Sequence, residues 1–378
     1  MQGLIGPLKE LAEFEELCKN KKKDAGMIRV CGCVNSQKSH MMYAIGDGCK
    51  YKVIACSSET KAKQIYEEYR FLDNNTYLYP AKDFLFYKAD IRSKELVKQR
   101  MEGIQAVLSG EPVTVVTSLD GFMDHLAPKE SIAEKVLKIQ NDSVLKLDEM
   151  AEKLSVIGYD REVQVEGPGQ FAVRGGILDI YPLTEELPVR IELWGDEVDS
   201  IRTFDVESQR SIENLMDIVI YPAVEFPQNG EKGVSFLDYF PPEDTILFLD
   251  EPVRLVDEIL ELCGIADIKY ELAGKLNVPQ KKRLESGYDL EEEEAKIFPV
   301  TEILKKINCY SSIGFYALGM KCKGLEVRES YEIQAKSVNP YNNSFEMLTR
   351  DLKRLKRNDY RVILLSGSRT RAKRLAED

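Results

Sequence analysis

Histidine is nearly absent from this sequence: His40 and His125 are the only two among 378 residues. Neither has a serine or cysteine around it in the pattern of a nucleophilic enzyme, so the sequence gives no support for that kind of catalysis. No apolar run approaches the roughly 20 residues that a membrane-spanning helix needs. No signal-peptide pattern opens the chain. We therefore expect a cytoplasmic protein without membrane contacts.

The eight cysteines lack any pairing pattern. Cys31 and Cys33 form a C-x-C, but no second pair at zinc-binding spacing accompanies them. Their apolar neighbours Met27, Val30 and Val34 are typical of a buried strand, which favours core thiols over a metal or redox role. Nothing indicates a disulfide framework, as expected in a reducing compartment.

Basic residues are in the minority, and the formal net charge is −12. A chain this acidic is a poor general nucleic-acid binder, because phosphate contacts need clustered Lys and Arg. The exception is the basic segment 350–374. This segment could contact DNA, but Leu352, Leu355 and the apolar run after them also fit an ordinary helix and strand with a solvated basic face.

A phosphate-binding loop lacks its second glycine. Residues 32–39 read Gly-Cys-Val-Asn-Ser-Gln-Lys-Ser, against the template G-x-x-x-x-G-K-[ST]. Gly32, Lys38 and Ser39 fit the template, and Gln37 stands where it has glycine. That glycine lets the backbone turn its amides towards phosphate oxygens, because it adopts positive φ and has no side chain. The sequence therefore predicts a nucleotide-binding shell that has lost its nucleotide chemistry.

The second half of such a site would lie at Asp250 and Glu251. They follow a buried strand, where an acid pair would hold Mg²⁺ and orient water. Two interpretations stay open. In a live ATPase, Lys38 would contact the β/γ-phosphates and Ser39 would ligate magnesium. In a vestigial site, which we favour, both residues simply begin a helix.

The order of the elements predicts an α/β domain interrupted by a smaller α+β domain. Alternating strands and helices as far as about residue 117, with near-continuous apolar strands, indicate a parallel sheet. A helix at about 146–157 and short strands separated by turns then predict an antiparallel meander. We expect the strands of this meander at 170–174, 176–181, 189–194 and 198–204.

We place the domain boundaries at 1–123, 124–210, 211–336 and 337–378. The last segment combines a linker, a helix, an expected strand at 360–365 and a helix at 370–378 that has no stop signal. We expect it to begin a third domain, and the chain to be a fragment of a longer protein.

The strongest signature is the segment 169–182, which reads GQFAVRGGILDIYP, together with its continuation over 189–210. It resembles the module shared by UvrB, the damage-verifying helicase of bacterial excision repair, and Mfd, the bacterial transcription-repair coupling factor. Two details favour the Mfd family. The stretch FDVESQR at 204–210 is similar to its version, and the P-loop is degenerate here although UvrB keeps a working one. UvrB also continues Ser-His after the acid pair, where this chain has Pro252 and Val253.

The resemblance covers about 1–335 and implies a degenerate RecA-like (P-loop NTPase-type) domain interrupted by a UvrA-binding domain. It implies a non-catalytic adaptor that recruits UvrA and the excision-repair machinery to RNA polymerase stalled at DNA lesions. ATP- and magnesium-dependent translocation, polymerase release, and the contacts with polymerase and DNA would reside in C-terminal parts outside this chain. The fragment itself would need no cofactor. The alternative is an active UvrB-type ATP-dependent DNA helicase.

Carried over by position, the resemblance makes Arg161 and Arg174 candidate contacts to UvrA. Phe171 and Tyr181 are candidate apolar anchors. Interfaces are enriched in arginine, whose planar fork matches carboxylates, and in aromatic residues. The alternative is a sheet with ordinary surface arginines and core aromatics.

The meander also carries an acidic set and a single tryptophan. Catalysis or metal binding by the acids is less favoured than cross-strand pairing with Arg190 and Arg202. Trp194 is expected to pack inside the domain. The acidic residues are Asp179, Glu192, Asp196, Glu197 and Asp199.

Overall fold

The structure is a computed structural model, and it describes residues 5–21, 24–81, 94–228, 230–256 and 298–377. Seven single positions in the last range, and the side chains of 35, 36 and 94, fall outside the description: 318, 320, 321, 339, 343, 365 and 367. The chain divides into two compact units, Met1–Gln334 and Ala335–Asp378. Within the described ranges, every helix is too short or too polar to cross a lipid bilayer.

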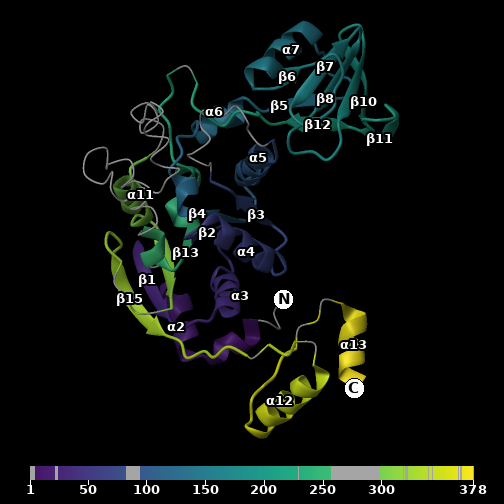
Figure 1. Cartoon of the computed structure of the whole chain (residues 1–378). Helices are drawn as coiled ribbons and strands as arrows, with labels where there is room; N and C mark the ends of the chain where they lie inside the picture. The colour runs from purple at the N-terminus through teal and green to yellow at the C-terminus, as the bar shows by residue number, and fades with distance from the viewer. Residues whose placement is uncertain are drawn as a thin grey trace, which may run out of the picture. The chain divides into compact units, whose positions relative to one another are not determined.

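A parallel sheet with strand order β15-β1-β14-β13-β2-β4-β3 forms the centre of the first unit (Figure 1). Two of its central strands, 113–118 and 245–250, are buried along their whole length because helices cover both faces of the sheet. The predicted α/β class is confirmed. The strands are β1 (Gly26–Cys31), β2 (Tyr51–Cys56), β3 (Thr76–Tyr79), β4 (Val113–Ser118), β13 (Thr245–Asp250), β14 (Ser311–Tyr316) and β15 (Val327–Glu332).

Two apolar clusters lie on opposite faces of this sheet, because successive strand residues point to opposite sides. Ile28 and Ile54 pack with helices α3 and α4, whereas Met27 and Val53 pack with α5 and α11. The amphipathic segment 8–20 forms two helices separated at Leu11, whose backbone is extended. The helices are η1 (Gly6–Glu10), α2 (Ala12–Asn20), α3 (Asn35–Ile45), α4 (Glu59–Arg70), α5 (Lys94–Leu108), η2 (Leu119–Phe122), η3 (Phe236–Tyr239), η4 (Pro242–Asp244) and α11 (Val300–Ile307).

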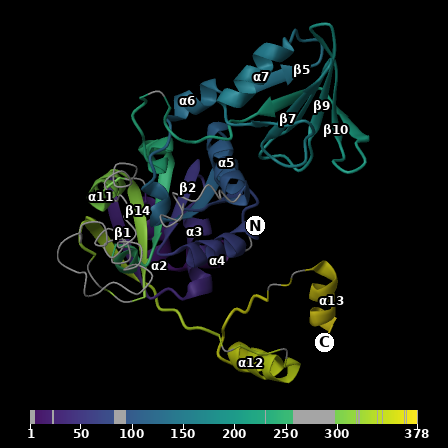
Figure 2. The same cartoon turned by 45° about the horizontal axis from the view of Figure 1, so that its top comes forward.

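Between β4 and β13 the chain forms a second sheet, with order β11-β10-β9-β8-β7-β6. It is antiparallel except for the β6–β7 pair. Helix α7 lies along one face (Figure 2) and packs there with Phe171, Leu178 and Ile191. The elements are α6 (Lys129–Glu134), β5 (Leu137–Gln140), α7 (Leu147–Val156), β6 (Asp160–Arg161), β7 (Gln170–Arg174), β8 (Ile177–Tyr181), β9 (Val189–Trp194), β10 (Glu197–Phe204), β11 (Ser211–Leu215) and β12 (Asp217–Ile220).

This inserted domain continues past residue 210. Strand β12 pairs antiparallel with β5, and Ile218 and Ile220 belong to the same core as α7. The boundary expected at 210 therefore falls inside the domain, because residues 211–220 show no clear hydrophobic period.

The chain leaves and re-enters the parallel-sheet part side by side. Leu126 and Val234 exchange backbone hydrogen bonds of 2.8 and 2.9 Å. Arg100, fully buried on α5, contacts both crossings. Its Nη2 lies 2.8 Å from a carboxylate oxygen of Asp124, and its Nε donates to both carboxylate oxygens of Glu225 at 2.8 and 3.0 Å.

The second unit contains α12 (Phe345–Arg357) and α13 (Arg369–Glu377). The Ser344 side chain accepts a hydrogen bond from Met347 N and so caps α12. The strand expected at 360–365 is wrong over 360–364, which is irregular, and 365 lies outside the described residues. Apolar β-branched residues alone do not make a strand, since the backbone needs a paired neighbour.

Candidate functional site

The degenerate P-loop connects β1 to α3, as expected, but the helix begins early. Its first residue is Asn35, directly after Val34. The amides of Gln37 and Lys38 both donate to the carbonyl of Val34, at 3.0 and 3.1 Å. In a working P-loop such amides face the phosphates. Here they are used in the first turn of the helix.

Gly32 has a structural reason to be glycine. Its φ is +85°, and a Cβ at this position would lie 2.2 Å from the carbonyl oxygen of Ile333. The chain after β15 passes this close because Ile333 N donates to Cys31 O at 2.9 Å. The first glycine of the motif is thus required by backbone packing, whether or not phosphate binds.

Lys38 and the acid pair come together at the end of β13. The ammonium Nζ lies 2.7 Å from Oδ1 of Asp250 and 2.6 Å from Oε1 of Glu251. The Lys38 side chain is 4% exposed and that of Asp250 is 0% exposed. Burial alone would lower the pKa of Lys38, but Asp250 and Glu251 outweigh it and hold that pKa above its ordinary value. The lysine therefore stays charged, with its charge balanced inside the protein.

Glu251 and Ser39 have further hydrogen-bond partners, whereas the side-chain oxygen of Gln37 has none. Glu251 has φ +53° and accepts the amide of Ala317 with both carboxylate oxygens, at 2.9 and 3.1 Å. Ser39 donates through Oγ to Glu68 at 2.9 Å. The Gln37 Oε1 is buried with no hydrogen-bond partner. Lys38, Asp250 and Glu251 therefore contact one another, whereas Ser39 binds Glu68 of α4 instead.

The C-x-C thiols lie in the core beside this loop. Cys31 and Cys33 are both buried. Burial raises the pKa of the Cys33 thiol to about 11, so it is protonated at neutral pH. Among the residues that the structure describes, no three or more His, Cys, Asp or Glu side chains gather as metal ligands. This placement agrees with the core-thiol interpretation.

The inserted domain presents a polar face, defined as the side of its sheet that points away from α7 and the core. Strand alternation places charged residues there, and paired residues of neighbouring strands share a face. Two rows cross it: Ala172, Asp179, Arg190 and Arg202 in one, and Arg174, Ile177, Glu192 and Ser200 in the next.

Asp179 is the centre of the first row. It is 1% exposed and accepts hydrogen bonds from Arg190 Nε and Nη2 at 2.7 and 2.9 Å, and from Arg174 Nη2. Arg202, in the same row, forms an ion pair with Glu192 of the next row. The prediction that the acids pair with Arg190 and Arg202 is confirmed for Asp179 and Glu192. A carboxylate this buried needs such partners, because an unpaired buried charge is strongly destabilising.

Residues of the stretch 204–210 hold the side chain of Arg190 in place. The Arg190 guanidinium lies 4.5 Å from the ring centre of buried Phe204 and donates a hydrogen bond to Gln209 Oε1 at 2.9 Å. Gln209 has φ +57° in a turn where Ser208 donates to Asp205 through both N and Oγ. These hydrogen bonds lower the pKa of Asp205. The signature FDVESQR therefore builds a rigid support for the arginine.

The predicted contact residues divide into three groups. Arg174 has a side chain that is 43% exposed. Tyr181 lies half-buried on the polar face, and its hydroxyl donates to Glu186 O at 2.7 Å. Phe171 is 0% exposed in the core beneath α7, so an anchoring role at the surface is wrong. Arg161 is exposed at the sheet edge in register with Phe171, so it is not in the row of Arg174.

Trp194 was expected to pack inside, but it is 84% exposed. It ends β9 before the turn at Gly195 and pairs with Glu197. Alternation along β9 places it on the same face as Arg190 and Glu192. The sequence does predict this exposure, because positions 189, 191 and 193 are all apolar and point inward, which places 194 on the outer face.

Residues 137–226 match the family model of the UvrB interaction domain. This range begins at β5 and takes in the whole six-stranded sheet together with β12, so the polar face lies within the matched residues.

Relatives matched by the chain include transcription-repair-coupling factors of several bacteria. The protein of Bacillus subtilis is 42% identical over 169 residues, which is 44% of this chain. Those of Staphylococcus epidermidis and Haemophilus influenzae are 37% and 32% identical, over 41% and 42% of this chain. Each match spans only 13–14% of the relative's own length. The predicted resemblance to the Mfd family is confirmed for the matched part of the chain.

Proposed function

We propose that this chain recruits UvrA to transcription stalled at DNA damage, through the polar face of its UvrB interaction domain. The observation that carries this is the pairing of a rigidly held arginine surface with an exposed tryptophan. Arg174 and Arg190 are fixed on one buried carboxylate, Asp179. Trp194 lies two positions along β9 from Glu192, on the same face.

Rigid arginines and an exposed tryptophan are the residue types that dominate binding energy at protein interfaces. Ordering them costs little on association, because the two arginines are already held in place. A tryptophan that stays 84% exposed gains apolar burial only when a partner covers it. The name of the matched domain supports a UvrA-type partner.

The parallel-sheet part is proposed as a RecA-type scaffold that does not hydrolyse ATP. Support comes from the strand–loop–helix order at β1 and α3, and from β13 lying two strands away with its acid pair. A nucleotide phosphate does not fit the residues present, since the ammonium of Lys38 and the amides of 37 and 38 already have internal partners. We propose neither polymerase release nor DNA translocation for this chain.

The test is UvrA binding by the whole chain, measured by calorimetry with purified UvrA. Trp194→Ala and Arg174→Ala should each weaken binding at least about tenfold, the range expected of hot-spot residues. Arg174→Ala is preferred to charge reversal, because Arg190 still neutralises Asp179 and the fold stays intact.

Matched controls lie on α4 and just after it, far along the chain from the polar face. Phe71 is 85% exposed and Arg70 is exposed, so Phe71→Ala and Arg70→Ala remove the same kinds of side chain. They should leave the affinity unchanged. Wild-type affinity in both polar-face variants would refute the proposal, as would an equal loss in the controls.

A further inference from the structure

The second unit carries a charge opposite to that of the chain. Residues 335–378 contain eleven Lys and Arg but five Asp and Glu, whereas the whole chain has a net charge of −12. The basic residues are concentrated in and after α12. A positive segment on a strongly acidic protein is the kind of charge segregation that marks a polyanion contact.

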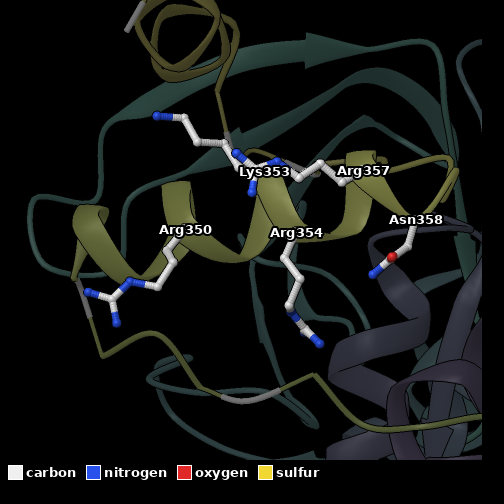
Figure 3. A pocket seen from close by; sticks show the side chains of 5 residues that line it. All are labelled: Arg350, Lys353, Arg354, Arg357 and Asn358. Carbon is white, nitrogen blue, oxygen red and sulfur yellow. The ribbon is translucent and has the colours of Figure 1, made fainter.

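Helix α12 is amphipathic, with an apolar face and a basic face. Positions 345, 348, 352 and 355 are apolar, and the opposite side carries Arg350, Lys353, Arg354 and Arg357. Figure 3 shows the latter as two rows, with Arg350, Arg354 and Asn358 leaving the helix on one side and Lys353 and Arg357 on the other. A shallow hollow lies between the rows and is lined by these five side chains. We call this surface the basic groove.

The spacing suits a chain of phosphates. Residues four apart on a helix stand one above another, separated by about 6 Å of helix axis. The two rows therefore offer cations at intervals close to the distance between successive phosphates of one nucleic-acid strand. Planar guanidinium groups bind phosphate oxygens in pairs, which favours arginine at such positions.

The cations of the basic groove have weak internal partners. Arg350 lies 3.3 Å from Glu346, with both side chains over three-quarters exposed. Arg354 pairs with Asp351 at 2.6 Å, and its own side chain is 64% exposed. Exposed pairs of this kind contribute little and exchange readily for a stronger anion. Lys38 differs from these arginines, because its ion pairs with Asp250 and Glu251 are buried and keep its ammonium from binding a ligand.

We propose that the basic groove of α12 binds the phosphate backbone of duplex DNA without sequence preference. This goes beyond the proposed docking of UvrA and uses a different unit of the chain. The groove has no side chains positioned to read bases from a rigid scaffold, so its contribution is electrostatic. It would hold this chain close to the DNA on which its partner acts.

The test is fluorescence anisotropy of a labelled 20-base-pair duplex titrated with the whole chain at several salt concentrations. With four phosphate contacts, the logarithm of the binding constant should fall with the logarithm of salt at a slope of about −3.6. Arg350→Gln/Arg354→Gln should reduce the slope by about 2 and weaken binding at least tenfold at about 50 mM salt. Both side chains are exposed, so the variant should remain folded, which circular dichroism checks.

The matched control is Lys63→Gln/Arg70→Gln, which removes two exposed charges from α4. It should bind the duplex like the wild type. The proposal is overturned if the wild type fails to bind at 50 mM salt, or if the α12 variant keeps the wild-type slope. It is equally overturned if the control loses as much affinity, or if vesicles of phosphatidylserine compete away the duplex at equal phosphate concentration.

Discussion

Arg100 and Glu225, 125 residues apart in the sequence, meet in a fully buried two-point ion pair. The same guanidinium lies 2.8 Å from Asp124 and donates through Nη1 to the carbonyl of Pro80 at 2.7 Å. It also lies 4.3 Å from the ring centre of Tyr79. One arginine on α5 therefore holds the two crossings that connect the inserted domain to the parallel sheet.

Replacing Arg100 with methionine should destabilise the protein by about 3–5 kcal/mol, because it removes the buried cation that two buried carboxylates share. Urea denaturation followed by circular dichroism measures this. Arg350→Met is the control, since it breaks an exposed pair and should change stability by less than about 0.5 kcal/mol. A loss below about 1 kcal/mol for Arg100→Met would show that the pair does not hold the crossings.

Restoring the missing P-loop glycine should not restore nucleotide binding. Gln37→Gly removes the side chain, but the Lys38 ammonium remains bound to Asp250 and Glu251, and the 37 and 38 amides remain in the first turn of α3. Calorimetry with ATP and magnesium should give no affinity tighter than millimolar for either the wild type or the variant. Micromolar binding by Gln37→Gly would show that the glutamine alone blocks the site.

His125 should make the protein acid-sensitive. Its ring packs against that of Phe298 at a tilt of 55°, with ring centres 4.2 Å apart. Burial lowers the pKa of His125, although Glu302 and Asp124 act in the opposite direction. Above the ordinary value of 6.5 both folded and unfolded states are neutral at this position. Below 6.5 the unfolded chain takes up the proton first, so stability falls with pH until the lower folded pKa is reached.

The matched comparison is His125→Gln, which cannot be protonated. The stability of wild type minus that of the variant should decrease between pH 7.5 and pH 5, as measured by thermal melting at each pH. Since all other titrating groups are common to both proteins, they cancel in the difference. A pH-independent difference would contradict a lowered pKa of this imidazole in the folded protein.

Sequence patterns predicted the parts of the fold where periodicity is strong. The strand expected at 189–194 has its observed bounds, because strict alternation of apolar and polar residues leaves one arrangement of its apolar face. Strands β11 and β12 were missed because polar residues dominate the first and the second is only four residues long. A strand was wrongly predicted over the apolar run 360–364, which is irregular because none of the described strands pairs with it.

Side-chain roles were predicted less well than side-chain identities. Alternation along the strands favours Phe171 inside and Trp194 outside, whereas interface chemistry alone favours Phe171 at the surface and hydrophobicity alone favours Trp194 inside. The buried triad at Lys38 could be expected only in outline. That the lysine is held by the acid pair, and not merely near it, depends on how β1, β14 and β13 are ordered in space.

The bridge between Leu126 and Val234 brings the outgoing and returning chain within one hydrogen bond of each other. A peptide of a few residues would span that gap, because closing a short loop between adjacent ends costs little. The inserted domain could thus be removed, or replaced by another domain, at two neighbouring points of the backbone. Such a connection lets the inserted domain change during evolution while the parallel sheet keeps its packing.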